Sequence, residues 1–392
     1  MTKTRHISAA FIALGVALTA LQPAAATAST EPAKPATVDT GELSISLQEA
    51  IRDRNQQMVA DGTVTSGSAQ MQRFSIRAKG KVSAEYEELR ARKKRLANYG
   101  QAYSNIKTTF ESQTFEVLGD TATADVTEKT EMTYTTGGPP QTYIYEQVVE
   151  FTKADNGWVI DNIKPKSPNG TPPSTVVSAE QLAYAKNPPG SQAALKIGTG
   201  RVATPAKAVA PNDHVPETKP AVGPKTGATT PSLMAGYDYT AMVNYARSWA
   251  LGRNGAYRQF GNDCQNFVSQ SLKAGGWQDQ GGWYQYDSSW WYDWANQTYS
   301  WTGAQNFHNF AVGQGRVTYL SYLNDLGPAD VLQVHWPEGT PDVDHSMFVT
   351  YSPWSAGTRD IRVSYHTNDV LDRSVWDLYA SFPYATWYGL RT

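Results

Sequence analysis

The sequence predicts an α+β protein with two folded parts joined by a proline-rich segment. Three observations indicate this organisation. Residues 41–163 begin with helix-forming segments and continue with segments in which apolar and polar residues alternate. Residues 164–236 contain twelve of the 22 prolines in the 392-residue chain. Residues 237–392 contain eleven of the 12 tryptophans and the single cysteine, and are long enough for one independent core.

The first 28 residues have the pattern of a secretory signal peptide. Lys3 and Arg5 give a basic start, residues 7–21 are mostly apolar, and small residues run up to Ala28. The apolar run is shorter than the ~20 residues that span a bilayer, so we expect cleavage rather than anchoring. The sequence therefore predicts a secreted, extracellular protein with no membrane segment after cleavage of residues 1–28.

Residues 41–163 are expected to form a small domain that starts with helices. Residues 46–49 (Ser-Leu-Gln-Glu) fit a capping box, which predicts a helix to about Ala60. A second helix is expected over 85–98. Alternation then predicts antiparallel strands over about 122–134, 143–151 and 158–163. Two helices followed by long strands that end in NGWVIDNI resemble the NTF2-like cone fold.

Residues 164–236 are predicted to be a linker between the two domains. Proline, alanine, threonine, glycine and lysine dominate this stretch, and such a composition buries too little apolar surface to fold. A short helix is expected near 178–186. We expect few contacts to cross the linker, so that the two domains fold separately.

Charge and cysteine content exclude several classes of protein. The net charge of −2 argues against a nucleic-acid binder, which needs a basic surface. One cysteine cannot form an internal disulfide or a cysteine-cluster zinc site. His335, Asp342, Asp344 and His345 do not have the spacing of a known metal motif. We therefore expect a monomer with no metal and no cofactor.

Cys264 is the first candidate for chemistry. Asn262 or Asp263 can cap a helix that starts at Cys264, and Gly275-Gly276 can end it. The amides and dipole of a helix N-terminus lower a thiol pKa and can hold an oxyanion. The same placement also fits a small buried hydrophobe. An unpaired thiol retained in an exported chain favours the nucleophile.

A cysteine nucleophile needs a base, and His345 is the best-placed histidine. The segment from His345 to Tyr351 alternates, so His345 should begin a strand and share a face with Met347. The segment after residue 360 should return as the second strand of a hairpin. In the simplest register His345 faces His366, whereas matching of the apolar faces favours a register shifted by one residue. His366, Asn368 and Asp369 therefore all stay open as the group that orients His345.

Five segments resemble the bacterial putative amidase domain family, which is similar to the NlpC/P60 branch of papain-like cysteine peptidases and amidases. These are YDYTAMVNYARSWA, NDCQNFVSQSLKAGGW, DVLQVHW, DHSMFVTY and VSYHTNDVLDRS. The resemblance covers 237–392 and implies a papain-like α+β domain. It also implies Cys264 as nucleophile, His345 as base, His366 at the third position and Gln259 as the oxyanion glutamine.

Aromatic residues are concentrated between Trp277 and Trp301 without a clear period. They predict either a wall of the core or a substrate groove, in which Trp283, Trp290 and Trp291 would stack on sugar or peptide faces. Together these observations predict a secreted cysteine amidase or peptidase. By analogy with the family, its substrate is a cell-wall peptide such as peptidoglycan. The alternative is a non-catalytic extracellular module that binds a glycan or peptide through its tryptophan-rich surface.

Overall fold

The structure is a computed structural model that describes residues 40–62, 68–167, 170–187, 236–320, 322–337, 342–355 and 358–392. The chain divides into two units, 1–38 and 39–392, and all described residues belong to the second unit. The predicted signal peptide, residues 1–28, therefore lies outside the described residues.

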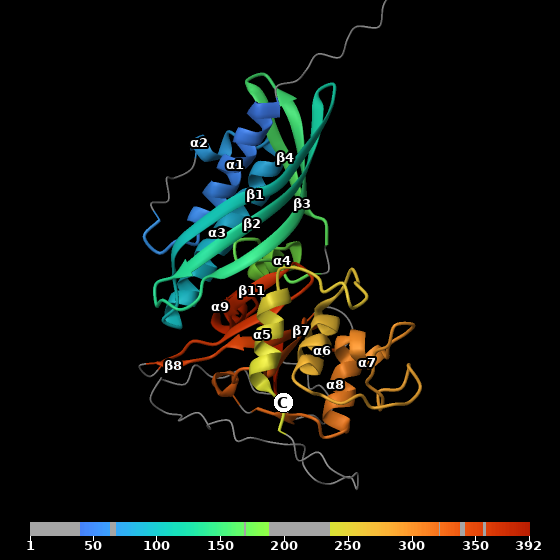
Figure 1. Cartoon of the computed structure of the whole chain (residues 1–392). Helices are drawn as coiled ribbons and strands as arrows, with labels where there is room; N and C mark the ends of the chain where they lie inside the picture. Colours follow the sequence, from blue (N-terminus) through green and yellow to red (C-terminus); the bar gives the residue numbers. More distant parts are fainter. Residues whose placement is uncertain are drawn as a thin grey trace, which may run out of the picture. The chain divides into compact units, whose positions relative to one another are not determined.

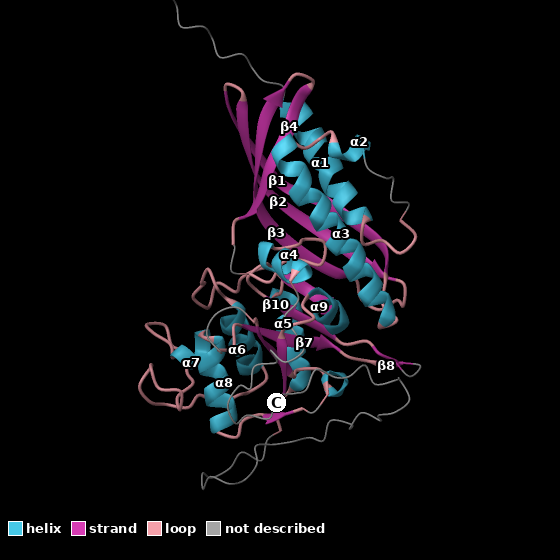
Figure 2. Cartoon of the chain, turned by 180° about the vertical axis from the view of Figure 1, so that it is seen from behind, coloured by secondary structure: helices cyan, strands magenta, loops and turns pink. Residues whose placement is uncertain are grey.

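The N-terminal part consists of helices packed on long antiparallel strands (Figures 1 and 2). Its elements are α1 (Thr40–Gln56), α2 (Ser68–Met71), α3 (Ile76–Asn98), β1 (Tyr103–Leu118), β2 (Thr121–Tyr134), β3 (Gln141–Ala154) and β4 (Gly157–Pro165). Figure 2 shows α1 and α3 against one face of these strands. The predicted helix start at Ser46 is wrong. Leu43 is already part of the buried face of α1, so the helical period begins before the expected cap.

Part of the predicted linker is packed into this fold. Helix α4 (Ala179–Lys186) forms where a short helix was expected, and Ser178 and Gln181 make a reciprocal capping box at its start. Before this helix, Ser174 and Thr175 are fully buried. Residues 188–235 of the predicted linker lie outside the described residues.

The C-terminal part places helices on a mostly antiparallel sheet. Its helices are α5 (Tyr239–Trp249), α6 (Cys264–Ala274), α7 (Tyr299–Thr302), α8 (Ala304–Gly313), the short 3-10 helix η1 (Leu323–Asp325) and α9 (Val375–Ser381). Its strands are β5 (Thr318–Tyr319), β6 (Val331–His335), β7 (His345–Tyr351), β8 (Trp354–Ser355), β9 (Thr358–Arg359), β10 (Arg362–Tyr365), β11 (Val370–Ser374) and β12 (Thr386–Arg391). Helices α5 and α6 pack on β7, and α9 contacts α3 of the N-terminal part (Figure 1).

One sheet runs through both parts of the structure. Its strand order is β1-β2-β3-β11-β10-β7-β6-β12-β5, and β4 also pairs with β3. Strands β3 and β11 join the two parts through the pairs Val370–Tyr143 and Leu371–Thr142. Ser174 Oγ donates to Asp377 Oδ2 over 2.6 Å in a buried contact beside this junction.

The expectation that few contacts cross between the two domains is therefore wrong. An unpaired strand edge exposes backbone groups that favour pairing, and composition does not reveal which edges meet. The expected domain boundaries themselves stay a prediction.

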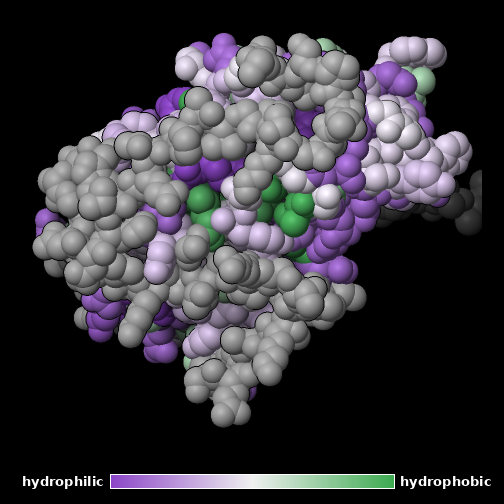
Figure 3. All heavy atoms as spheres, turned by 90° about the horizontal axis from the view of Figure 1, so that it is seen from below, coloured by the Kyte–Doolittle hydropathy of each residue, from purple (hydrophilic) through white to green (hydrophobic). Residues whose placement is uncertain are grey.

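The described residues confirm the α+β class, with a large antiparallel sheet. Within the described ranges, no helix is both long and apolar enough to cross a membrane. In the view from below, the coloured surface is largely hydrophilic around a small group of hydrophobic residues (Figure 3).

Candidate active site

Cys264 is the first residue of α6, a helix buried on nearly all sides. Asp263 occupies the N-cap position, and Gly275 ends the helix, as the sequence predicted. The backbone N–H groups of Ser346 and Gln265 act to lower the pKa of the Cys264 thiol. The thiol also lies 3.6 Å from Asn262 Oδ1. The sulfur is therefore surrounded by the kind of donors that stabilise a thiolate or an oxyanion.

Burial nevertheless dominates the titration of this thiol. Cys264 is 2% exposed. Desolvation raises the pKa of Cys264 to about 11, although the neighbouring N–H groups act in the opposite direction. The expectation of a lowered thiol pKa is wrong, because the desolvation of the buried thiol outweighs the effect of the helix N-terminus. The thiol is protonated at neutral pH and needs a base.

His345 begins β7 as predicted and is buried. Its ring meets that of Tyr365 edge-on, with centroids 5.1 Å apart. Within the described part of the chain, His345 Nε2 is buried without a hydrogen-bond partner. Desolvation, and then the positive charge of Arg373, lower the pKa of His345 to about 3. The imidazole is therefore neutral at pH 7, which is the form that accepts a proton.

Cys264 and the His345 ring lie on opposite faces of β7. Phe348 packs in the same core cluster as Phe267 of α6. Since side chains alternate along a strand, Ser346 shares the face of Phe348, and His345 points to the other face. The backbone of residues 345–346 lies beside the Cys264 sulfur. Among the described residues, no hydrogen bond joins the His345 imidazole to that sulfur.

His366 has partners of its own on the α6 side of the sheet. Its Nδ1 lies 2.6 Å from Asp263 Oδ2, and its Nε2 lies 2.8 Å from the carbonyl oxygen of Trp249. The hairpin register pairs Val349 with Val363, which is the register that matches the apolar faces. This register differs by one residue from the one in which His366 faces His345. In this geometry both ring nitrogens of His366 are occupied away from His345.

The other predicted polar residues also have partners elsewhere. Asp369 makes two hydrogen bonds to Arg253, at 2.7 and 2.8 Å. Asn368 Nδ2 donates to the carbonyl oxygen of Thr171 over 3.2 Å. Gln259 is exposed in the loop before α6. The structure thus brings neither Asn368 nor Asp369 into hydrogen-bonding contact with His345.

The three predicted stacking tryptophans occupy different environments. Trp290 is fully buried, and its ring lies 4.7 Å from that of Trp301 in the core. It cannot stack on a substrate, because its faces are already packed. Trp283 is 56% exposed. Trp291 is half-buried and donates from Nε1 to the carbonyl oxygen of Gly282.

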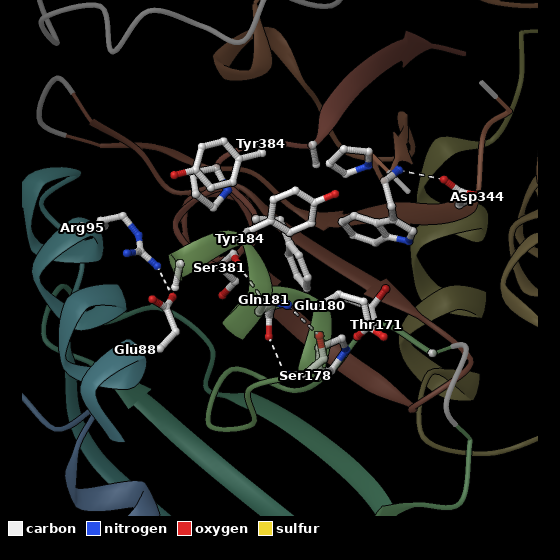
Figure 4. A pocket seen from close by; sticks show the side chains of 18 of the residues that line it. Glu88, Arg95, Thr171, Ser178, Glu180, Gln181, Tyr184, Asp344, Ser381 and Tyr384 are labelled. Atoms are coloured by element: carbon white, nitrogen blue, oxygen red, sulfur yellow. Dashed lines mark hydrogen bonds and ion pairs between the residues drawn. The ribbon is translucent and has the colours of Figure 1, made fainter. Parts of the chain in front are cut away.

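A cavity of about 500 Å³ is lined by residues close in sequence to Cys264 and His345, although neither of these two residues is part of its lining. Asn262, which contacts the sulfur, and Asp344, which precedes His345, both line it. The remaining walls come from α3, from the segment around α4, and from residues 381–385. Figure 4 shows Tyr184 and Tyr384 between the Glu88–Arg95 pair and Asp344.

The sequence reasoning missed most residues of this cavity. Tyr184 and Gln181 lie on α4, which was assigned to a proline-rich linker. The serine–glutamine spacing at 178–181 was a local signal for the helix, but nothing local showed where the helix would pack. Trp336 also lines the cavity, although it lies outside the aromatic-rich stretch.

Comparison with known proteins supports hydrolase chemistry in the C-terminal part. Residues 236–390 match the family model described as "Putative amidase domain". This part of the chain is similar to amidase domains. A protein named "Uncharacterized protein YhbB" from Bacillus subtilis (strain 168) is 32% identical over 122 residues. That match covers 29% of this chain and 37% of the relative, so the chain spans less than half of that protein. The family match indicates an amide hydrolase in general and names no substrate.

Proposed function

We propose that this protein is an exported cysteine-dependent amide hydrolase with Cys264 as its nucleophile. In this proposal residues 237–392 form a papain-like domain of the NlpC/P60 type, and residues 41–163 form an NTF2-like domain. The substrate is a peptide amide of the cell wall, and the protein acts as a monomer. The substrate class and the export rest on the family resemblance and on the pattern of residues 1–28.

One observation carries this proposal. Cys264 lies at the start of a buried helix, where the backbone N–H groups of Ser346 and Gln265 act to lower the pKa of its thiol. Asn262 connects this point to the cavity, because it both contacts the sulfur and lines the cavity. A substrate carbonyl that enters from the cavity would meet N–H donors suited to a developing oxyanion.

The reaction requires one proton transfer in each direction. The neutral imidazole of His345 takes the proton of the Cys264 thiol, and the thiolate attacks the amide carbonyl carbon. The protonated imidazole then gives its proton to the departing amine as the C–N bond breaks. Water hydrolyses the thioester and restores the thiol. For this role the imidazole has to reach the α6 face of β7, so the proposal requires the backbone around His345 to rearrange and to move the ring out of the buried environment beside Arg373 that lowers its pKa.

The buried, protonated thiol favours a second candidate function. A cysteine with a pKa raised to about 11 and no bond to an imidazole among the described residues fits a protein that binds peptides without cleaving them. In that case the cavity would hold a ligand, and Cys264 would be a packing residue.

Turnover and acyl-enzyme trapping separate the two functions. The full chain is incubated with peptidoglycan stem peptides and with simple peptide amides, and released amines are identified by mass spectrometry. We expect hydrolysis that Cys264→Ala abolishes, and a thioester adduct on the peptide that contains Cys264. The matched control is Ser271→Ala, which changes another small buried residue of α6. Hydrolysis retained in Cys264→Ala would contradict the proposed nucleophile.

A further inference from the structure

About half of the residues that line the cavity belong to segments outside the amidase-family match. Glu88 and Arg95 come from α3, and Glu180 and Tyr184 come from α4, all outside residues 236–390. The C-terminal part supplies Tyr384 and other residues of the opposite wall. The N-terminal part therefore contributes directly to the space in which a substrate would lie.

Contacts among the described residues hold the walls of this cavity together. Gln181 Nε2 donates to the carbonyl oxygen of Ser381 over 3.0 Å, which ties α4 to the end of α9. Arg95 Nε donates to the carbonyl oxygen of Ala380 over 2.8 Å, which ties α3 to the same helix. These bonds run between parts of the chain that are far apart in sequence. The cavity is thus a fixed feature of the packed structure and not a gap left between separate domains.

The charges that line the cavity favour a cation. Glu88, Glu180 and Asp344 contribute carboxylates, and Arg95 is the one cationic side chain among the lining residues that the structure describes. Arg95 is already paired with Glu88, so this pair is neutral. Glu180 lies on the exposed side of α4. The side chain of Asp344 is 32% exposed, and its Oδ2 accepts a hydrogen bond from Trp336 N–H and lies 3.2 Å from His335 Nδ1. Glu180, together with the part of the Asp344 charge that His335 does not balance, gives the cavity a negative charge that attracts positive ligands.

The aromatic rings of the cavity act in the same direction. Tyr184 and Tyr384 lie with ring centroids 5.6 Å apart (Figure 4). Trp336 and Phe382 form a second ring pair at 4.5 Å. Aromatic faces carry negative potential and attract an ammonium group. Carboxylates and aromatic faces together disfavour an anionic ligand.

We propose that this cavity is a specificity site for an ammonium group of the amide substrate. The ammonium is a free α-amine or a side-chain amine close to the scissile amide. Glu180 and Asp344 hold its charge, and Tyr184 and Tyr384 cover its apolar surroundings. This inference specifies a feature of the substrate, so it rests on the proposed function. In this view, the N-terminal part and α4 select the substrate.

Binding to a catalytically inactive protein tests the site without turnover. The full-length Cys264→Ala variant is titrated by calorimetry with alanyl-lysine amide in four forms: free, α-acetylated, ε-acetylated and doubly acetylated. We expect the doubly acetylated form to bind at least about 10-fold more weakly than the free form. Of the two singly acetylated forms, the one that binds more weakly carries its acetyl group on the amine that the site binds. Equal affinity for the free and the doubly acetylated forms, or no binding of either, would overturn the proposal.

A second variant links the effect to the cavity. In the Cys264→Ala background, Glu180→Gln should weaken binding of the free peptide about 5-fold and leave the doubly acetylated form unchanged. Glu116→Gln is the matched control, because Glu116 is an exposed carboxylate on β1 outside the cavity. Equal effects of the two substitutions would show that general charge, and not this site, attracts the peptide. Ammonium-dependent binding without any hydrolysis by the unmodified protein would support this site and refute the proposed function.

Discussion

Replacement of His366 by phenylalanine tests whether this residue supports the fold or orients a catalytic base. The His366 ring packs against Phe267 with centroids 4.3 Å apart and the ring planes tilted by 38°, so phenylalanine keeps a ring of similar size in this contact. It loses the hydrogen bonds to Asp263 and Trp249. A hydrogen bond to a charged group contributes about 1.5–3 kcal/mol, and a neutral one contributes about 1 kcal/mol. We therefore expect His366→Phe to lower the free energy of unfolding by about 3 kcal/mol.

Urea unfolding followed by tryptophan fluorescence measures this loss through the shift of the midpoint. Asn368→Gly is the control, since glycine tolerates the left-handed backbone of this position (φ 71°) and the change removes one long hydrogen bond to Thr171, at an expected cost of about 1 kcal/mol. The reasoning would be refuted if His366→Phe unfolded within about 0.5 kcal/mol of the unmodified protein while its kcat/KM fell at least about 100-fold. That pattern belongs to an orienting residue and not to a residue that holds Asp263.

Three further outcomes are expected. Trp290→Ala should lower the free energy of unfolding by about 3–5 kcal/mol and Trp283→Ala by less than about 1 kcal/mol, because the first is buried and the second is 56% exposed; similar losses would contradict the buried position. The pKa of His345 is lowered to about 3 in the folded protein and is about 6.5 when unfolded, so the unfolded chain binds the extra proton between these values. Stability should therefore fall by about 1.4 kcal/mol per pH unit as pH drops below about 6.5, and His345→Gln should lose this slope in urea midpoints at pH 7 and 5. Cleavage at a protease site engineered within 188–235 should leave residues 40–187 and 236–392 associated on gel filtration, since β3 pairs with β11; two separate peaks would disprove the shared sheet.

Local patterns predicted the elements that depend on neighbours in the sequence. The helix from Cys264 to Ala274 could be recognised because a polar cap, an apolar face and a pair of glycines lie within one short segment. A short helix was also expected near 178–186, and α4 forms there with a capping box of Ser178 and Gln181. Alternation likewise predicted β7 from its first residue, His345. In each case the signal and the structure that it forms lie within a few turns of backbone.

The candidate site depended on contacts between distant residues. A shift of one residue in the β7–β10 register moved His366 to the face of α6, where Asp263 binds it. The observed register pairs Val349 with Val363, as matching of the apolar faces favoured. The pKa of Cys264 likewise depended on distant residues. Neighbouring residues in the sequence set its position at the helix start, but its burial, which raises the pKa, comes from segments far away in the sequence.

The sequence by itself determined the α+β class, the helix that carries Cys264 and the strand that begins with His345. It could not determine that α4 would close a cavity with Tyr384, or that β3 would continue into β11. Helices and hairpins arise from periodicity and capping within one segment, and these can be read from residue order. Strand register, burial of a thiol and the walls of a cavity arise when segments hundreds of residues apart exclude water from the same space, and only the tertiary structure decides which segments those are.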